Sequence, residues 1–231
     1  MKNIRIKLYA SMGLALFALA GAAWAADCGG DEPCSCGDNV VEDRTLIAGE
    51  DLVLGTACAG NGLIMNTEGV TLDLGGKRIT GKGNGAGVKI EVDGVTIRNG
   101  KIEKFGRGIS TNSSATNDSL IEKIKTRLNT QGGIKINGDF NILEKNSAME
   151  NDGHGIRLDG HDNELIKNTA DKNEFDGIHV DGTGNTLEKN SAKKNNGDGI
   201  SVEGGGNIDD GGNKGKKNVG DDCLIDLLPC V

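Results

Sequence analysis

The sequence repeats itself every 22 residues, and this repeat restricts the possible folds more than any other feature. Gly155, Gly177 and Gly199 each precede a short aliphatic run and follow one another at that spacing. Asparagines recur with the same period in three series: Asn141, Asn163, Asn185 and Asn207; Asn146, Asn168 and Asn190; and Asn129, Asn151, Asn173 and Asn195. A unit of this length cannot bury its apolar side alone and must stack on neighbouring units. The repeat therefore predicts an elongated molecule built from stacked units.

Each unit is predicted to consist of short strands rather than helices. Residues 156–159 and 178–181 alternate aliphatic and polar side chains, and a period of two is the pattern of a strand. The runs last four or five residues before a glycine or an asparagine. Both residue types tolerate positive φ, so we expect them to form the corners between strands.

Stacking equivalent strands in parallel would place aliphatic residues above one another in three interior columns. The columns are Ile134, Ile156, Ile178 and Ile200; Leu143, Leu165 and Leu187; and Ala148, Ala170 and Ala192. The predicted fold is all-β, a single-stranded right-handed parallel β-helix of about seven coils, whose hand follows the preference of parallel crossovers. The corner asparagines are expected to stack as amide ladders along the axis.

The first 25 residues have the pattern of a signal peptide. Basic residues at positions 2, 5 and 7 precede an apolar run over residues 8–22, and an Ala-Trp-Ala cleavage pattern follows at 23–25. The run is too short for a membrane span. We therefore expect an exported protein, secreted or periplasmic, without a stable membrane anchor.

All six cysteines follow this segment, and they lie near the two ends of the remaining chain. An oxidising compartment favours disulfides over free thiols. Six cysteines allow fifteen pairings; proximity favours two of them and leaves a third: Cys36 with Cys58, Cys223 with Cys230, and then Cys28 with Cys34. A zinc site is the alternative, although the Cys-x-Cys motif has no matching second half. We expect residues 26–59 to form an N-terminal cap, residues 60–218 the repeats and residues 219–231 a C-terminal cap that plugs the last coil.

The amino-acid composition argues against two classes of binding partner. The chain carries 34 acidic and 26 basic side chains, a net charge of −8, which argues against nucleic acid. No tryptophan or tyrosine follows residue 25, which argues against a module that stacks neutral sugars on such rings. A charged glycan, read by basic side chains or by carboxylate-bound calcium, is the expected ligand. A monomer is the expected state.

The repeat G-I-x-V/L-x-G-x-x-N-x-L-x-x-N-x-A-x-x-N, at residues 155–173 and 177–195, resembles the secreted right-handed parallel β-helix repeat family of the pectate-lyase-like superfamily. The resemblance covers about residues 60–218. It implies the fold but no single activity, because the family includes polysaccharide lyases, hydrolases, epimerases, metal-centre maturation factors and surface proteins. Pro33 and Pro229 are the only prolines, so the proline-containing motifs of pectate lyases and alginate epimerases are absent.

The residues between the inward positions would point outward and line up from coil to coil. One outward column is Lys135, Arg157, His179 and Ser201, and the next is Asn137, Asp159, Asp181 and Glu203. A third set, His154, Asp176 and Asp198, stands at the corner before each strand, where the glycine that follows breaks the alternation and leaves the direction open. These groups could serve acid/base chemistry on an acidic sugar or hold calcium. The catalytic candidates are Asp159, Asp181, His179 and Arg157, and the ligand-binding candidates are Lys135, His154, Asp176, Asp198 and Glu203.

These features predict an exported protein that binds an acidic polysaccharide and, if it is an enzyme, acts as a polysaccharide lyase or glycoside hydrolase. In the competing interpretation the outward charges only neutralise one another across strands. The ridge Lys123, Lys145, Lys167 and Lys189 could likewise grip a polyanion or be a solvated face, and we expect His161 to lie in a loop. The alternative function is a non-catalytic scaffold that presents loops such as residues 111–118 to a partner.

Overall fold

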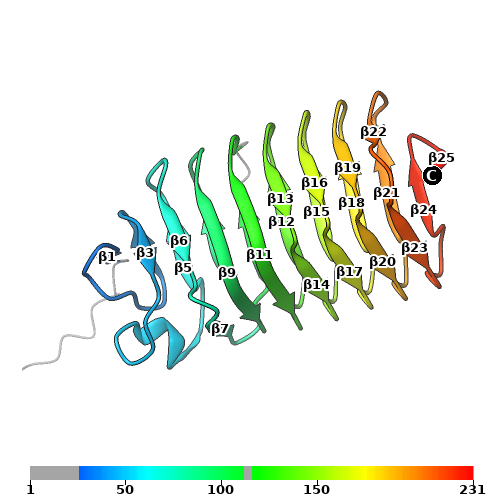
Figure 1. Ribbon diagram of the computed structural model, residues 1–231. Helices are drawn as coiled ribbons and strands as arrows, with labels where there is room; N and C mark the ends of the chain where they lie inside the picture. The colour runs from blue at the N-terminus through cyan, green and yellow to red at the C-terminus, as the bar shows by residue number, and fades with distance from the viewer. Residues whose placement is uncertain (1–25, 112–115, 231) are drawn as a thin grey trace, which may run out of the picture.

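The computed structural model describes residues 26–111 and 116–230, and these residues form a β-solenoid whose turns stack along one axis (Figure 1). The predicted signal peptide lies outside the described residues, as do residues 112–115 of the loop at 111–118. Strands make up nearly all the regular structure, beside one short 3₁₀ helix, η1 (Leu52–Leu54). In the described part of the chain, none of the helical structure has the length and apolar character that crossing a membrane requires.

One face of the solenoid, called sheet A here, is an 11-stranded sheet in which successive turns contribute successive strands. Its strands are β1 (Asp27–Cys28), β2 (Asp38–Val40), β5 (Leu63–Met65), β8 (Ala86–Ile90), β10 (Arg107–Thr111), β12 (Gly132–Asn137), β15 (Ile156–Asp159), β18 (Ile178–Asp181), β21 (Ile200–Glu203), β24 (Cys223–Ile225) and β25 (Leu228–Pro229). All neighbours are parallel except β24 and β25.

The rest of each turn belongs to a second, 14-stranded sheet. Its strands are β3 (Arg44–Thr45), β4 (Ala57–Cys58), β6 (Thr71–Asp73), β7 (Arg78–Gly81), β9 (Thr96–Glu103), β11 (Leu120–Arg127), β13 (Ile142–Glu144), β14 (Ser147–Met149), β16 (Glu164–Ile166), β17 (Thr169–Asp171), β19 (Thr186–Glu188), β20 (Ser191–Lys193), β22 (Ile208–Asp209) and β23 (Lys214–Lys216). The long strand β11 pairs with both β13 and β14, because a corner interrupts the later turns at that point.

The three predicted interior columns are confirmed. Ile134, Ile156, Ile178 and Ile200 pair in register along sheet A, and the leucine and alanine columns pair in register in the second sheet. Every member of the three columns is at most 1% exposed. Aliphatic burial along the axis is therefore what holds the turns together.

The asparagine ladders are also confirmed, and each rung is satisfied on both sides. Asn168, fully buried, donates from its backbone N–H and its Nδ2 to Asn190 Oδ1, at 2.8 and 3.0 Å. Its own Oδ1 accepts the corresponding two bonds from Asn146, and its Nδ2 also reaches the carbonyl of Leu143 at 2.7 Å. The amides thus pair polar groups that would otherwise be buried without partners.

Aspartates replace asparagine as acceptors where the ladders end. Asn207 donates to both carboxylate oxygens of Asp226, and Asn218 donates to Asp222. Burial alone would raise the pKa of Asp226, but the bonds from Asn207 and from the Gly205 N–H lower it overall. The last turn therefore closes its ladders with carboxyl groups that water can also reach.

The expectation that asparagine supplies the left-handed corners is wrong. Positive φ falls on the residue before each ladder asparagine, for example 54° at Lys145 and 55° at Lys167, and on none of the ladder asparagines themselves. The asparagine side chain must point into the core to build the ladder, so the preceding, outward residue takes the turn. In the middle series that residue is a lysine of the ridge, Lys145, Lys167 or Lys189, and Lys123 also has positive φ although Ile124 follows it.

Replacing Lys167 with asparagine is expected to stabilise the protein. A side chain with a Cβ costs about 1–2 kcal/mol in the left-handed region, and asparagine tolerates that region better than lysine. We expect Lys167→Asn to raise the free energy of unfolding by about 0.5–1 kcal/mol, measured by denaturant titration. Lys193→Asn, at the exposed last residue of β20 and without positive φ, is the control and should give no gain. Equal effects of the two changes would contradict the assignment of strain to the corner.

The N-terminal cysteine-rich segment is more than a lid, because it builds a turn of its own. Strands β2, β3 and β4 pair in parallel with β5, β6 and β7. This turn brings the solenoid to about eight turns, where the repeat alone predicted about seven. The predicted disulfides Cys28–Cys34 and Cys36–Cys58 are present and tie this turn together.

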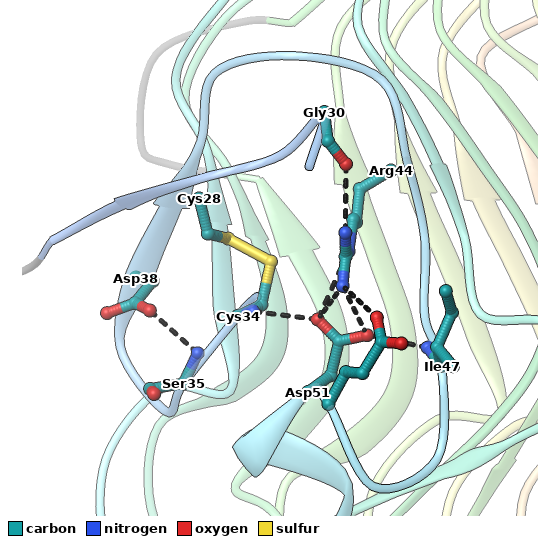
Figure 2. A network of polar contacts seen from close by, with 9 residues as sticks. Cys28, Gly30, Cys34, Ser35, Asp38, Arg44, Ile47 and Asp51 are labelled. Atoms are coloured by element: carbon teal, nitrogen blue, oxygen red, sulfur yellow. Dashed lines mark hydrogen bonds and ion pairs between the residues drawn. A yellow bond between two sulfur atoms is a disulfide. The ribbon is translucent and has the colours of Figure 1, made fainter. Parts of the chain in front are cut away.

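A buried ion pair fixes the loop that follows β3 (Figure 2). The side chain of Asp51 is 0% exposed and that of Arg44 is 4% exposed. Arg44 Nη2 donates to both Asp51 oxygens at 2.9 Å, and Nη1 donates to the Gly30 carbonyl at 2.8 Å. Asp51 also accepts the backbone N–H groups of Cys34 and Ile47 at 2.7 and 2.6 Å. The carboxylate thus joins three separate segments of the first turn.

At the other end, the predicted disulfide Cys223–Cys230 closes the hairpin of β24 and β25. Ile225 pairs in register with the buried Val202 and is 5% exposed. Leu227 and Leu228, however, are 81% and 69% exposed, so these apolar residues do not plug the last coil as expected. They sit at the tip of the hairpin, which turns away after Ile225.

Candidate functional site

The structure builds the two predicted outward columns on sheet A. Lys135, Arg157, His179 and Ser201 are neighbours in register, as are Asn137, Asp159, Asp181 and Glu203. Alternation along each strand sends these side chains outward while the aliphatic residues between them fill the interior. Residues that are 22 positions apart in sequence are therefore one strand apart on this face.

The third set, whose direction the sequence left open, points to the same face. Asp176 Oδ2 lies 3.1 Å from His179 Nδ1 and 3.4 Å from His154 Nδ1. The three side chains are between 18 and 23% exposed, and the two imidazole rings lie 5.0 Å apart. The structure thus joins two ligand-binding candidates and one catalytic candidate in a single cluster, His154, Asp176 and His179, called the imidazole–carboxylate cluster here.

Charge and burial oppose each other in this cluster. Burial by itself would raise the pKa of Asp176, but the two imidazoles beside it and the Asp198 N–H bonded to it lower that pKa well below its ordinary value. The hydrogen bond with Asp176 raises the pKa of His179, and burial opposes this rise. Asp176 is therefore an ionised acceptor that favours a cation, either a proton on His179 or a metal ion.

Asp198 belongs to the same column as His154 and Asp176, but it bonds to backbone and carboxylate groups of the adjacent turns. The Asp198 N–H donates to Asp176 Oδ1 at 2.7 Å, and Asp198 Oδ1 accepts the Asp221 N–H at 2.7 Å. Each carboxylate therefore ties its turn to the next one. The structure shows a structural role for Asp198 and does not bring it into the cluster.

The predicted catalytic carboxylates, Asp159 and Asp181, are paired in register, but their surroundings differ. Arg157 Nε donates to Asp159 at 2.9 and 3.1 Å, and Lys135 Nζ lies 3.8 Å from Asp159. Asp181 is exposed and forms no ion pair in the described part of the chain. The contact of Arg157 with Asp159 fits the interpretation that the charges of this face neutralise each other.

A depression of about 230 Å³ opens on sheet A beside the cluster. Its lining consists of Arg107, Gln131, Gly132, Ile134, Lys135, His154, Arg157 and Phe175, with no carboxylate among them. Gly132, which adds no side chain to the lining, lies between Arg107 and His154 in one column, and Gly153 lies between Gln131 and Phe175 in the next.

A second depression continues the first along the axis. It is lined by Asn61, Gly85, Ala86, Lys89, Arg107, Ser110 and Gln131, so the two share Arg107 and Gln131. Lys89 pairs with Glu91 at 2.5 Å, whereas Arg107 makes no ion pair within the described residues. The two depressions form one surface, called the cationic track here, whose basic residues are Lys89, Arg107, Lys135 and Arg157.

Sequence reasoning missed several residues of this track, including Lys89, which aligns with Lys135 through Ser110. Arg107 precedes an aligned glycine, Gly108, just as His154 precedes Gly155, so the same alignment could have found it. Phe175 stands where the neighbouring turns have glycine, and it is 55% exposed with its ring 5.4 Å from that of His154. Gln131 occupies the same series of positions as Phe175. An exposed phenyl ring is therefore present on this face, although no tryptophan or tyrosine follows residue 25.

The lysine ridge and His161 are accounted for without a ligand. Lys123 and Lys145 pair with the glutamates that precede them at 2.8 and 2.6 Å, and Lys189 contacts Glu188 in the same way. His161 lies in the loop after β15, as expected, and its Nδ1 accepts the Thr183 N–H at 3.0 Å. The ridge is a face of compensated charge.

The fold places the chain among parallel β-solenoids, whose turns share one hydrophobic axis and whose outward columns form continuous faces. Within that class it belongs to the right-handed β-helix family, because the model of the right-handed β-helix region matches residues 61–214, more than half of the chain. This match confirms the predicted family. No curated protein and no solved structure matches the chain. The three disulfides are consistent with an extracellular or periplasmic protein.

Proposed function

We propose that this β-helix protein is exported and binds an acidic polysaccharide along the cationic track. The observation behind the proposal is that two adjoining depressions of a protein with net charge −8 are lined by four basic side chains and by no carboxylate. Glu91 and Asp159, which lie outside the lining, contact three of these four residues, and Arg107 makes no ion pair among the described residues. A concave surface lined by side chains of one charge concentrates ligands of the opposite charge.

The spacing of the track suits a polymer rather than a single small anion. Its basic residues come from successive strands of sheet A, which are spaced ~4.8 Å apart. A polyuronate carries a carboxylate on every sugar and can meet several of these residues at once. Arg107 and Arg157 can bind carboxylates in two-pronged fashion, and the exposed face of Phe175 can pack against a sugar ring.

Binding is better supported than hydrolysis. A glycoside hydrolase needs two carboxyl groups about 5–9.5 Å apart at the scissile bond. The lining of the depressions contains none, and Asp159 is engaged by Arg157. We therefore propose a binding protein, and the catalytic roles predicted for Asp159 and Asp181 do not enter the proposal.

The test compares two pairs of lysine or arginine replacements. Arg107→Gln with Lys135→Gln removes two cations of the track and leaves the Arg157–Asp159 contact intact. Lys145→Gln with Lys167→Gln removes two cations of the ridge and is the matched control. Titration calorimetry with polygalacturonate and alginate should show at least about tenfold weaker binding for the first variant. The control should bind both polyuronates as the parent protein does. Neither the parent nor the variants should bind neutral dextran.

Two results would contradict the proposal. One is the absence of binding to either polyuronate at low ionic strength, where such interactions are strongest. The other is an equal loss of affinity in the track and ridge variants, which would indicate attraction to charge in general. Melting temperatures of both variants should match that of the parent, because the replaced side chains lie on the surface.

A further inference from the structure

We propose that the imidazole–carboxylate cluster binds one divalent transition metal ion of the Zn²⁺ type. His154, Asp176 and His179 each offer one ligand atom, and these atoms all lie within 4.8 Å of one another. The inference does not rest on polysaccharide binding, because it concerns a different ligand and, apart from His154, residues outside the lining of the track.

The two distances from Asp176 to the imidazoles already match those between neighbouring ligands of a metal ion. Zinc binds imidazole nitrogen and carboxylate oxygen at about 2.0–2.2 Å, so neighbouring ligands of a tetrahedral site lie about 3.3–3.5 Å apart. Asp176 Oδ2 lies 3.1 Å from His179 Nδ1 and 3.4 Å from His154 Nδ1. Small side-chain adjustments would be enough to admit the ion.

His154 supplies a second, independent observation. Its Nδ1 is a buried atom that makes no hydrogen bond among the described residues, although it lies within ion-pair distance of Asp176. A buried polar atom without a partner is rare and points to a missing ligand or ion. His179 Nδ1, by contrast, has a hydrogen-bonding partner in Asp176.

The surroundings hold the ligands in place. Asp176 Oδ1 accepts the Asp198 N–H at 2.7 Å, which orients the carboxylate and leaves Oδ2 directed at the two imidazoles. The ring of His154 packs against that of Phe175 on one side and that of His179 on the other. Partners of this kind orient metal ligands and raise metal affinity.

The donor set selects the class of metal. Two imidazole nitrogens and one carboxylate oxygen suit Zn²⁺, Co²⁺ or Ni²⁺, whereas Ca²⁺ and Mg²⁺ prefer oxygen ligands. Three protein ligands leave a further coordination position for water or an anionic ligand. Because His154 also lines the depression, that position would lie beside the cationic track.

The experiment is a titration of the full chain, without an affinity tag and with its disulfides formed, against Zn²⁺, Co²⁺ and Ca²⁺ in the absence of any glycan. We expect one Zn²⁺ per chain, the visible absorption of Co²⁺ in a low-symmetry site, and no binding of Ca²⁺. His154→Ala, Asp176→Asn and His179→Ala should each weaken Zn²⁺ binding by at least about tenfold. His154→Ala is the decisive variant, because it removes the ring whose Nδ1 has no hydrogen bond and keeps the bonds of Asp176 to His179 and to the Asp198 N–H, so the metal-free protein should stay folded.

His161→Asn is the matched control. It removes the remaining histidine of the chain, and asparagine can still accept the Thr183 N–H, so Zn²⁺ binding should not change. The proposal is overturned if the parent chain binds no Zn²⁺, if His154→Ala binds it as well as the parent does, or if His161→Asn weakens binding equally. Because the titration contains no polysaccharide, none of these outcomes tests the proposed polysaccharide binding.

Discussion

Replacing Asn168 with alanine is expected to lower the free energy of unfolding by about 3–5 kcal/mol, one of the two largest effects we predict. The change removes the acceptor of two buried donors of Asn146 and the donor to the Leu143 carbonyl. Each buried polar group left without a partner costs about 1–3 kcal/mol. Equilibrium unfolding in guanidinium chloride, followed by circular dichroism, measures the loss.

The control for this prediction is Asn196→Ala. Asn196 is exposed, and its side chain bonds only to Glu174 at 3.0 Å, so its loss should cost less than about 0.5 kcal/mol. If Asn168→Ala were no more damaging than Asn196→Ala, the amide ladders would be incidental to stability. The stacking of the turns would then be stabilised by the aliphatic columns alone.

The second large effect is expected for Asp51→Asn. This change leaves the guanidinium of Arg44, whose side chain is 4% exposed, without its buried counter-charge. Breaking a buried ion pair by removing one partner typically costs about 3–5 kcal/mol. The loss should appear first as opening of the N-terminal turn, because repeat structures unfold locally at their ends. Hydrogen exchange of the amides in β2 and β3, together with the unfolding midpoint, measures it.

Glu50→Gln provides the comparison at the same cap. Glu50 is 56% exposed and lies 3.8 Å from Arg44, a contact that water screens, so its neutralisation should cost less than about 1 kcal/mol. Equal effects of the two changes would mean that Arg44 is not specifically balanced by Asp51. Faster exchange in the central turns, with β2 and β3 unaffected, would also contradict this account of the cap.

Much of the fold could be predicted because residues 22 positions apart in the repeat occupy equivalent places in successive turns. Once Gly155, Gly177 and Gly199 are aligned, the interior columns and the ladders follow from side-chain type alone. The N-terminal turn could not be recognised in this way. Its strands β2 to β4 are only two or three residues long, and a loop with a 3₁₀ helix interrupts them. The left-handed lysines were missed for a related reason, since sequence shows which residue tolerates positive φ but not which one must adopt it.

The candidate site was predictable only in part. Alternation placed Arg157, His179 and Asp159 on the outward face of sheet A. It failed at His154 and Asp176, because the glycine after each of them is a corner and the alternation stops there. Gly132 adds no side chain to the lining of the depression, and the sequence alone does not show which residues of the adjacent turns surround it. Arg107 and Phe175 could be recognised as site residues only once the depression that they line was known.

The most direct test of the central claim, that side chains aligned by the stacked turns form one cationic binding surface on sheet A, is a nitrogen–proton NMR titration with a short oligogalacturonate. The account predicts that amide shifts concentrate at Arg107, Gln131, Lys135 and Arg157 and leave the lysine ridge unchanged. Shifts centred on Lys123, Lys145, Lys167 and Lys189, or no shifts at concentrations where the polymer binds, would contradict it.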